Sequence, residues 1–464
     1  MKRLFLILSL AFISTFVSLM QAGHAQEAKP RHAPNALPGV EPAMLTADYW
    51  IALYPDADEV IMTPEEIRRF NAIVRSRANV EEGFEGPSRK PLLPLSMPRT
   101  MPGDSLRFIL SHNRDKLFNP DALYGSEDYY DGRNAIYSDV MKQEIADRMN
   151  LDAVPGVVRR RYGIVVNHAM VRQYPTDVPG YHNTTTALDR FQVTDLCIGN
   201  PVAILHESTD GDYLYVECPL ARGWIAARDI AVGSLADIRG IVGSEPFLMA
   251  AGNKVPVYGD PGCKRFARHF YFSARLPLVR RAGHAYVVSM PYREEDGSLG
   301  ITNGYVKPDA DVHVGFPPYT TRNVLTQIFK LLNTPYGWHG QDNKRDCVGV
   351  QRVLFRCFGI ETGRFIRDAS DNKVLVDSKL SVDEKIAIAR KVTPVITVAS
   401  APGHVVLFLG EGGNGKLYFM HQGGWGYKDE NGDHLIVNRV SINEVTHSWY
   451  NIKTPNCYTI MAFK

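Results

Sequence analysis

The sequence from residue 346 to residue 359 reads Asp346-Cys-Val-Gly-Val-Gln-Arg-Val-Leu-Phe-Arg-Cys-Phe-Gly359. Its apolar residues recur at helical spacing: Val350, Val353, Leu354 and Cys357. Gly359 is suited to a left-handed cap that ends the helix. Cys347 is therefore predicted at or just before the first turn, where unpaired N–H groups and the helix dipole favour the nucleophilic thiolate. Taken alone, a cysteine here is also compatible with a small buried thiol that packs the helix start.

Two histidines downstream give this cysteine a chemical context. His404 opens the apolar run Val405-Val-Leu-Phe-Leu409, which has the length of a buried strand, and His421 directly follows Leu417-Tyr-Phe-Met420. A cysteine at a helix start, a histidine on a strand and a third polar residue form the papain-like arrangement. We expect His404 to take the thiol proton and His421 to hold the imidazole in the right tautomer.

Each histidine taken singly is also compatible with a satisfied core or surface residue. A zinc site is disfavoured, because no two of Cys347, His404 and His421 show the short spacings of structural zinc ligands. No metal and no organic cofactor is implied.

Four short stretches together make the C-terminal third recognisable: Pro335-Tyr-Gly-Trp338, Arg345-Asp-Cys347, Pro402-Gly-His-Val-Val-Leu-Phe-Leu-Gly410 and Met420-His421. They resemble the catalytic domain of the NlpC-type cell-wall cysteine peptidases. The resemblance implies a papain-like core with Cys347 as nucleophile, His404 as base and His421 as the orienting residue. It also implies that Tyr336 and Asp346 line the substrate pocket.

The sequence departs from that family's pattern at two positions. The residue after the nucleophile is commonly serine and here is Val348, which removes one hydroxyl that could help to bind substrate. A glycine of the usual Tyr-Gly-Trp-Gly-Gly motif is replaced by His339. Both departures bear on specificity and leave the three catalytic candidates intact.

Length and charge fit an exported, multidomain protein. The chain has 464 residues, enough for three or four domains. Residues 1–25 combine Lys2 and Arg3, an apolar run and small residues before Gln26, as a secretory signal peptide does. Removing that segment leaves 50 basic and 50 acidic residues, a balance that disfavours nucleic acid as a partner. The mature protein is expected to lack a membrane span, and a retained anchor helix is the alternative.

The remaining chain divides into further predicted units. Residues 26–155 read as a mostly helical stabilising region, with a capping box at Thr63-Pro-Glu-Glu66 and a second helical stretch at Ser138–Met149. Residues 156–235 and 236–315 read as two small barrels of short strands, and Asp210-Gly211 is a hairpin signal in the first. Both sets resemble bacterial SH3-like domains. Residues 318–464 form the catalytic domain, and the predicted class is α+β.

The resemblance implies a hydrolase that cuts the γ-D-glutamyl–diamino acid (meso-diaminopimelate) bond of peptidoglycan stem peptides. Asp346 could pair with a free N-terminal amine of L-alanine, or it could cap the helix instead. The expected location is the periplasm, with secretion as the alternative. Two other functions stay open: a papain-like amidase or acyltransferase on other amides, and a non-catalytic wall-binding module.

Overall fold

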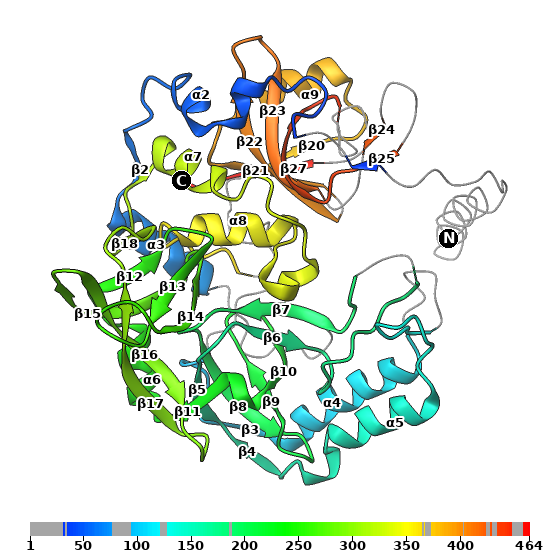
Figure 1. Ribbon diagram of the computed structural model, residues 1–464. Coiled ribbons are helices and arrows are strands. Elements are labelled where there is room, and N and C mark those ends of the chain that lie inside the picture. The colour runs from blue at the N-terminus through cyan, green and yellow to red at the C-terminus, as the bar shows by residue number, and fades with distance from the viewer. Residues whose placement is uncertain are drawn as a thin grey trace, which may run out of the picture.

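The computed structural model describes residues 31–32, 35–76, 94–120, 128–184, 188–363, 366, 373–401, 403–423, 427–428, 434–447 and 458–464. The predicted signal peptide lies outside these residues. Helices and antiparallel sheets occupy separate segments of the chain, so the fold is α+β and multidomain, as predicted. Figure 1 shows the C-terminal sheet at one end, two β-barrels at the other, and helix α8 between them.

The C-terminal domain is a six-stranded antiparallel sheet with the order β20-β27-β21-β22-β23-β26. Its strands are β20 (Lys373–Val376), β21 (Thr397–Ala401), β22 (His404–Glu411), β23 (Leu417–Gly423), β26 (Arg439–Glu444) and β27 (Tyr458–Ala462). Its helices are α7 (Thr321–Phe329), η5 (Trp338–Asn343), α8 (Cys347–Arg356) and α9 (Val382–Ala389). A short sheet beside it pairs β24 (Tyr427–Lys428), β25 (His434–Ile436) and β1 (Arg31–His32).

The two faces of this sheet carry different cores, as the alternation of a strand requires. On β22, Val405 and Leu407 pack with residues of α8, such as Val350 and Leu354. Phe408 packs on the opposite face, in a smaller cluster. The apolar face of α8 is thus buried against β22 and β23, which fixes the start of the helix beside the start of β22.

The first barrel is a seven-stranded antiparallel sheet with the order β11-β5-β8-β9-β10-β6-β7. Its strands are β5 (Arg161–Val165), β6 (Ala169–Arg172), β7 (Gln192–Leu196), β8 (Pro201–Glu207), β9 (Tyr213–Glu217), β10 (Arg222–Ala226) and β11 (Ile230–Gly233), with η4 (Ala227–Asp229) before the last. The predicted hairpin at Asp210-Gly211 joins β8 to β9, and Gly211 takes the positive φ of 75° that such a turn requires.

The second barrel has the order β14-β13-β17-β16-β15-β12-β18 and follows the short helix α6 (Leu235–Val242). Its strands are β12 (Phe247–Ala250), β13 (Lys254–Tyr258), β14 (Phe266–Tyr271), β15 (Arg275–Ala282), β16 (Ala285–Arg293), β17 (Leu299–Val306) and β18 (Val312–Val314). Short apolar runs in the sequence, 247–249, 255–258, 285–289 and 304–306, indicate β12, β13, β16 and β17. The sequence pattern missed β14 and β15, whose mixed exposure leaves little alternation to detect.

The N-terminal region is divided between two different cores. One part holds η1 (Pro42–Leu45), α2 (Ala47–Ile51), β2 (Val60–Met62, paired with β19, Tyr319–Thr320) and α3 (Pro64–Ser76). Its Met44, Trp50 and Val74 belong to the core of the C-terminal domain. The other part holds β3 (Thr100–Pro102), α4 (Gly103–Phe118), α5 (Asp139–Arg148), η3 (Leu151–Ala153) and β4 (Val157–Arg159), and it packs on the first barrel.

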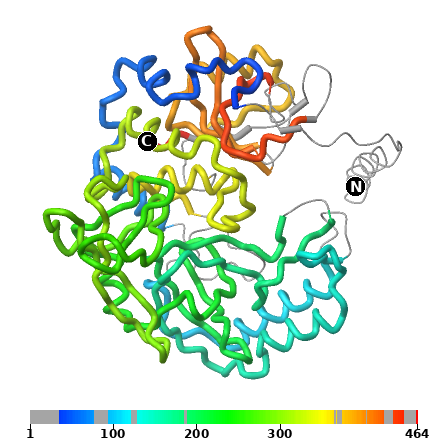
Figure 2. The backbone as a smooth tube through the Cα atoms, in the orientation of Figure 1, coloured from blue at the N-terminus to red at the C-terminus, as the bar shows by residue number. Residues whose placement is uncertain are grey.

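The region predicted to be mostly helical, residues 26–155, thus contributes to two separate cores. The predicted capping box is present, because the side chains of Thr63 and Glu66 exchange hydrogen bonds with each other's backbone N–H groups. Helix α4 was missed, although Leu106, Ile109 and Leu110 follow helical spacing. Figure 2 shows the blue N-terminal tube beside the orange and red C-terminal strands, far from the cyan helices α4 and α5.

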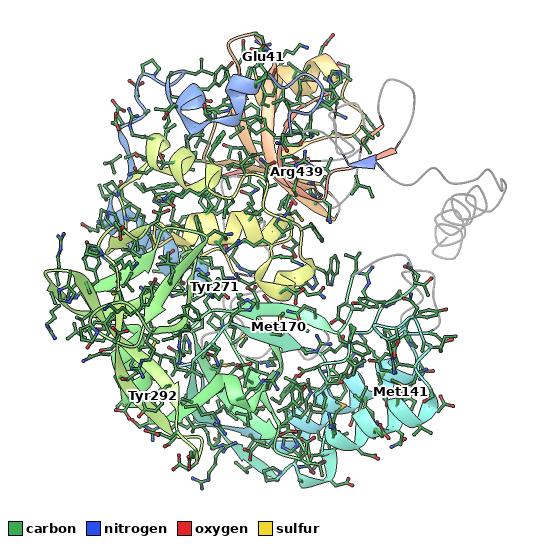
Figure 3. All side chains as sticks on the ribbon, in the orientation of Figure 1. Glu41, Met141, Met170, Tyr271, Tyr292 and Arg439 are labelled. Atoms are coloured by element: carbon green, nitrogen blue, oxygen red, sulfur yellow. The ribbon has the colours of Figure 1, made fainter. Side chains whose placement is uncertain are left out.

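Polar contacts tie the side of α8 that faces the barrels to both of them. Arg352 Nη2 lies 3.0 Å from Asp195 Oδ1 on β7, and Arg356 Nε donates to Ser273 Oγ over 2.7 Å. Arg345, just before the helix, donates to Asn253 Oδ1 over 2.7 Å. Figure 3 labels Met170 on β6 and Tyr271 on β14, in the layers of the two barrels that face the helix.

Within the part of the chain that the structure describes, no helix has both the length and the apolar character needed to cross a bilayer.

The packing of Trp50 predicts that the N-terminal segment stabilises the C-terminal domain. The side chain of Trp50 is fully buried, and its Nε1 donates to Met44 O over 2.9 Å. We expect Trp50→Ala to lower the free energy of unfolding by about 3–5 kcal/mol, seen as a lower urea midpoint by circular dichroism. Phe108→Ala, at a half-exposed position on α4, is the control and should cost about 0.5 kcal/mol. Equal midpoints for the two variants would contradict this packing.

Candidate active site

Cys347 is the first residue of α8, and its neighbour Asp346 is the N-cap. Asp346 Oδ1 accepts a hydrogen bond from Gly349 N over 2.6 Å, and Oδ2 accepts one from His339 N over 3.2 Å. One carboxylate thus closes the helix start and holds the preceding loop against it. Asp346 is buried, whereas Cys347 is half-buried.

His404 and His421 lie side by side at the same end of the neighbouring strands β22 and β23. His404 Nε2 and His421 Nδ1 are 2.6 Å apart, and their rings are nearly perpendicular, at 87°. The Cys347 sulfur lies against the backbone N–H of Val405, the residue that follows His404. The structure therefore brings the three residues predicted to be catalytic to one place.

The electrostatics of this group correct the prediction of a thiolate at the helix start. Burial raises the pKa of Cys347 to about 12, and the negative charge of Asp346 adds to the effect. Burial and the neighbouring His421 hold the pKa of His404 well below its usual range. Burial also lowers the pKa of His421 to about 4. At neutral pH the resting site is therefore an uncharged thiol beside two uncharged imidazoles, so His404 can act as a general base.

Two further residues connect to the histidine pair and were missed from the sequence. Asn443 on β26 hydrogen-bonds His421 and opposes the fall of its pKa. Asn443 Oδ1 in turn accepts a hydrogen bond from Ser441 Oγ over 3.0 Å. Single polar residues inside a strand give no sequence signal, and only the register of β23 with β26 places them here.

Tyr336 lies in the loop that leads to the helix, and it is half-buried. Its backbone is fixed on two sides: Tyr336 N donates to Asn438 O over 3.1 Å, and Tyr336 forms an isolated bridge with Arg345. Its role in substrate binding, like that of Asp346, stays a prediction.

The first barrel contacts this loop directly. The His339 ring Nδ1 is 2.8 Å from Gln192 O, and Gly340 lies against Asp195 with a φ of +87°. A Cβ built on Gly340 would lie 2.2 Å from Asp195 Cγ, so no other residue fits there. The guanidinium of Arg190 lies 4.7 Å from the centre of the Trp338 ring. The barrel thus supports the loop that carries the cap of Cys347.

Among the described residues, no group of three or more His, Cys, Asp or Glu side chains is arranged to hold a metal ion.

Comparisons with known proteins agree with this architecture. A family model described as "SH3 domain (SH3b1 type)" matches residues 179–226, within the first barrel. No curated protein sequence matches the chain. An NlpC/P60 endopeptidase from Photobacterium damselae subsp. piscicida has a similar solved structure. Its TM-score is 0.71 at 18% identity, and the match covers 94% of this chain and 99% of that one. An NlpC/P60 family protein from Bacillus cereus ATCC 10987 aligns with a TM-score of 0.47 at 16% identity, over 64% of this chain and 98% of that one.

The likeness to the Photobacterium protein, at low identity, shows the fold. The chain thus shares its fold with that NlpC/P60 endopeptidase, and its first barrel matches an SH3 domain, in agreement with the resemblance stated from the sequence motifs.

The uncharged resting state makes a testable prediction about thiol reactivity. Below a pKa of about 12, the thiolate fraction of Cys347 rises about tenfold for each pH unit, so alkylation by iodoacetamide should rise with pH from 7 to 10 without a plateau. Asp346→Asn keeps an N-cap side chain and removes the like charge, so it should lower the pKa and speed alkylation at each pH. Mass spectrometry of the Cys347 peptide measures both rates. A plateau of fast labelling near pH 6 would instead show a preformed thiolate–imidazolium pair.

Proposed function

We propose that this protein is a cysteine endopeptidase that hydrolyses the γ-D-glutamyl–diamino acid (meso-diaminopimelate) bond of peptidoglycan stem peptides. The observation that carries the proposal is the contact of His404 with His421 beside Cys347, at the first turn of α8. The fold supports it, since the similar protein from Photobacterium is described as an NlpC/P60 endopeptidase.

The first half of the reaction follows from the hydrogen bonds of the site. His404 Nε2 is in contact with His421. The other ring nitrogen, His404 Nδ1, is therefore the atom proposed to exchange a proton with the thiol. As the sulfur attacks the γ-carbonyl carbon, the S–H proton passes to His404 Nδ1 and an S–C bond forms. The imidazolium then protonates the amine of the diamino acid, and the C–N bond breaks.

The second half regenerates the thiol. A water molecule gives a proton to His404 Nδ1 and adds to the thioester carbon. The S–C bond then breaks, the sulfur recovers its proton from the imidazolium, and the glutamyl carboxylic acid leaves and gives its proton to solvent.

Negative charge that develops during both steps lies close to the helix start. The N–H groups of Cys347 and Val348 favour negative charge on the sulfur, and both belong to the first turn of α8. Gly349 N and Val350 N are already bonded to Asp346, so the first two N–H groups are the ones left to stabilise an oxyanion.

Asp346 supports the choice of a stem peptide with a free amine. Its carboxylate has four lone-pair sites and uses two of them for Gly349 and His339. A protonated N-terminal amine of L-alanine can bind a remaining site, which is worth about 1.5–3 kcal/mol. Tyr336, which comes before the same loop, is proposed to contact the same substrate. The substrate would then be a peptide already released from its sugar.

The remaining assignments follow from the sequence. The predicted signal peptide supports an exported protein, with the periplasm as the proposed location and peptidoglycan stem peptides as the partner. The balance of charge supports no role in binding nucleic acid.

Mass spectrometry of L-Ala-γ-D-Glu-meso-diaminopimelate, incubated with the mature protein, tests the proposal. We expect release of L-Ala-γ-D-Glu by the wild type and none by Cys347→Ala. If the peptide stays intact while Cys347 is alkylated, the chemistry is retained and the proposed substrate is wrong. An intact peptide together with an inert Cys347 would favour a wall-binding module.

The amine preference makes a separate prediction. N-acetylation of the L-alanine should lower kcat/KM by about 10–100-fold, because it removes the charge that pairs with Asp346. In Asp346→Asn the two peptides should be cut at similar rates, which separates recognition of the amine from capping of the helix. Equal rates for both peptides with the wild type would refute the amine contact.

A further inference from the structure

Four buried polar side chains form a row across three neighbouring strands. His404 starts β22, His421 lies on β23, and Ser441 and Asn443 lie on β26. Ser441 is directly opposite His421 in the antiparallel register, and Asn443 is two residues further along the same face. All four side chains are less than a tenth exposed. A hydrogen-bonded chain therefore runs away from Cys347 into the sheet.

We propose that Asn443, held by Ser441, is a positioning residue that selects the proton-accepting tautomer of His404 through His421. This proposal rests on the proposed function of Cys347 and the histidine pair. It adds two residues that act through another group and do not themselves touch the substrate.

The direction of the hydrogen bonds carries the argument. Ser441 Oγ donates to Asn443 Oδ1, so this amide oxygen is fixed on the inner side of the site. An amide oxygen has two lone pairs and can also accept from His421 Nε2–H. His421 Nδ1 is then an acceptor, and the 2.6 Å contact must be a donation from His404 Nε2–H. His404 Nδ1 is left with the lone pair that the thiol proton needs.

The opposite orientation of the amide would defeat the reaction. An Asn443 NH₂ group donating to His421 Nε2 would place the proton on His421 Nδ1. His404 Nε2 would then be the acceptor, and the proton of His404 would sit on Nδ1, where it faces the thiol. Such a site has no base. The structure has the first orientation, because Ser441 Oγ donates to Asn443 Oδ1 and so holds the oxygen of the amide in place.

The side chain of Asn443 is uncharged, so it orients the histidine pair without attracting a proton onto it. Among the described residues, the Phe419 ring on β23 lies 5.1 Å from the His421 ring, and the uncharged Asn443 on β26 bonds His421 with Ser441 behind it. Cys347, at the start of α8, is the titratable group beside the pair, and the charge of Asp346 acts on its thiol. A carboxylate in place of Asn443 would fix the same tautomer but would also attract a proton onto the pair. The amide orients the base and leaves it unprotonated at neutral pH.

Three variants test the proposal on the full mature chain. Asn443→Leu removes the acceptor at similar volume, and kcat should fall about 10–100-fold with KM unchanged. Ser441→Ala removes the group that orients the amide and should lower kcat a few-fold.

Asn443→Asp keeps the acceptor and adds a charge, so it should keep most of kcat. A carboxylate beside His421 raises the pKa of the pair, and the base then needs a higher pH to be free. The acid limb of the pH profile should therefore move to higher pH.

Ile442→Val is the matched control, because Ile442 lies between the two residues on β26 and packs in the opposite core. It should lower the urea midpoint and leave the pH profile unchanged. A purely structural role for Asn443 predicts the same behaviour for Asn443→Leu, and that result would overturn the proposal.

A readout without substrate separates this proposal from the proposed function. Long-range ¹⁵N–¹H spectra of histidine-labelled protein report which ring nitrogen carries the proton. The wild type should show His404 protonated at Nε2, and Asn443→Leu should show a mixture of tautomers. This result supports the positioning role even if the stem peptide is not cleaved. The same tautomer in both proteins would refute it, whether or not the peptide is cut.

Discussion

The ion pair between Arg352 and Asp195 is the contact on which the rest of the structure depends. Both side chains are largely buried, and the pair joins the helix that begins with Cys347 to the first barrel. Asp195 also accepts from His168 and lies against Gly340, so one carboxylate fixes the barrel, the helix and the loop before the helix. Removing one partner of such a buried pair leaves a charge without compensation, which costs more than the pair contributes.

Burial of Cys347, His404 and His421 has two effects on reactivity: it disfavours their charged forms, and it strengthens the polar contacts between them. It withdraws the sulfur and both imidazoles from water, and this keeps all three uncharged at neutral pH. It also strengthens the contact between His404 and His421 and the dipoles of the helix start, because a medium of low dielectric screens them less. The resting thiol is therefore a weak nucleophile, and the base beside it is in the neutral form that can accept its proton.

Helices, strands and turns that depend on local sequence pattern could be predicted. Contacts between residues far apart in the chain could not. The helix after Cys347, the strand after His404 and the hairpin at Asp210-Gly211 follow from periodicity and turn chemistry, and the structure has all of them. The proximity of Cys347, His404 and His421 came from a resemblance, since spacing alone does not place two strands beside a helix. The raised pKa of Cys347 could not be foreseen, because it reflects burial by residues far apart in the chain. Likewise, Asn443 meets His421 only through the register of β26.

The close packing at Gly340 limits which barrels could be combined with this C-terminal domain during evolution. Its contact with Asp195 leaves no room for a side chain, and the neighbouring His339 contacts the backbone of Gln192. The barrel and the loop before α8 therefore pack closely against one another, unlike domains joined by a flexible tether. Recombination that replaced this barrel with another would also disturb the loop that leads to Cys347. The two modules are expected to be inherited and to vary together, as one evolutionary unit.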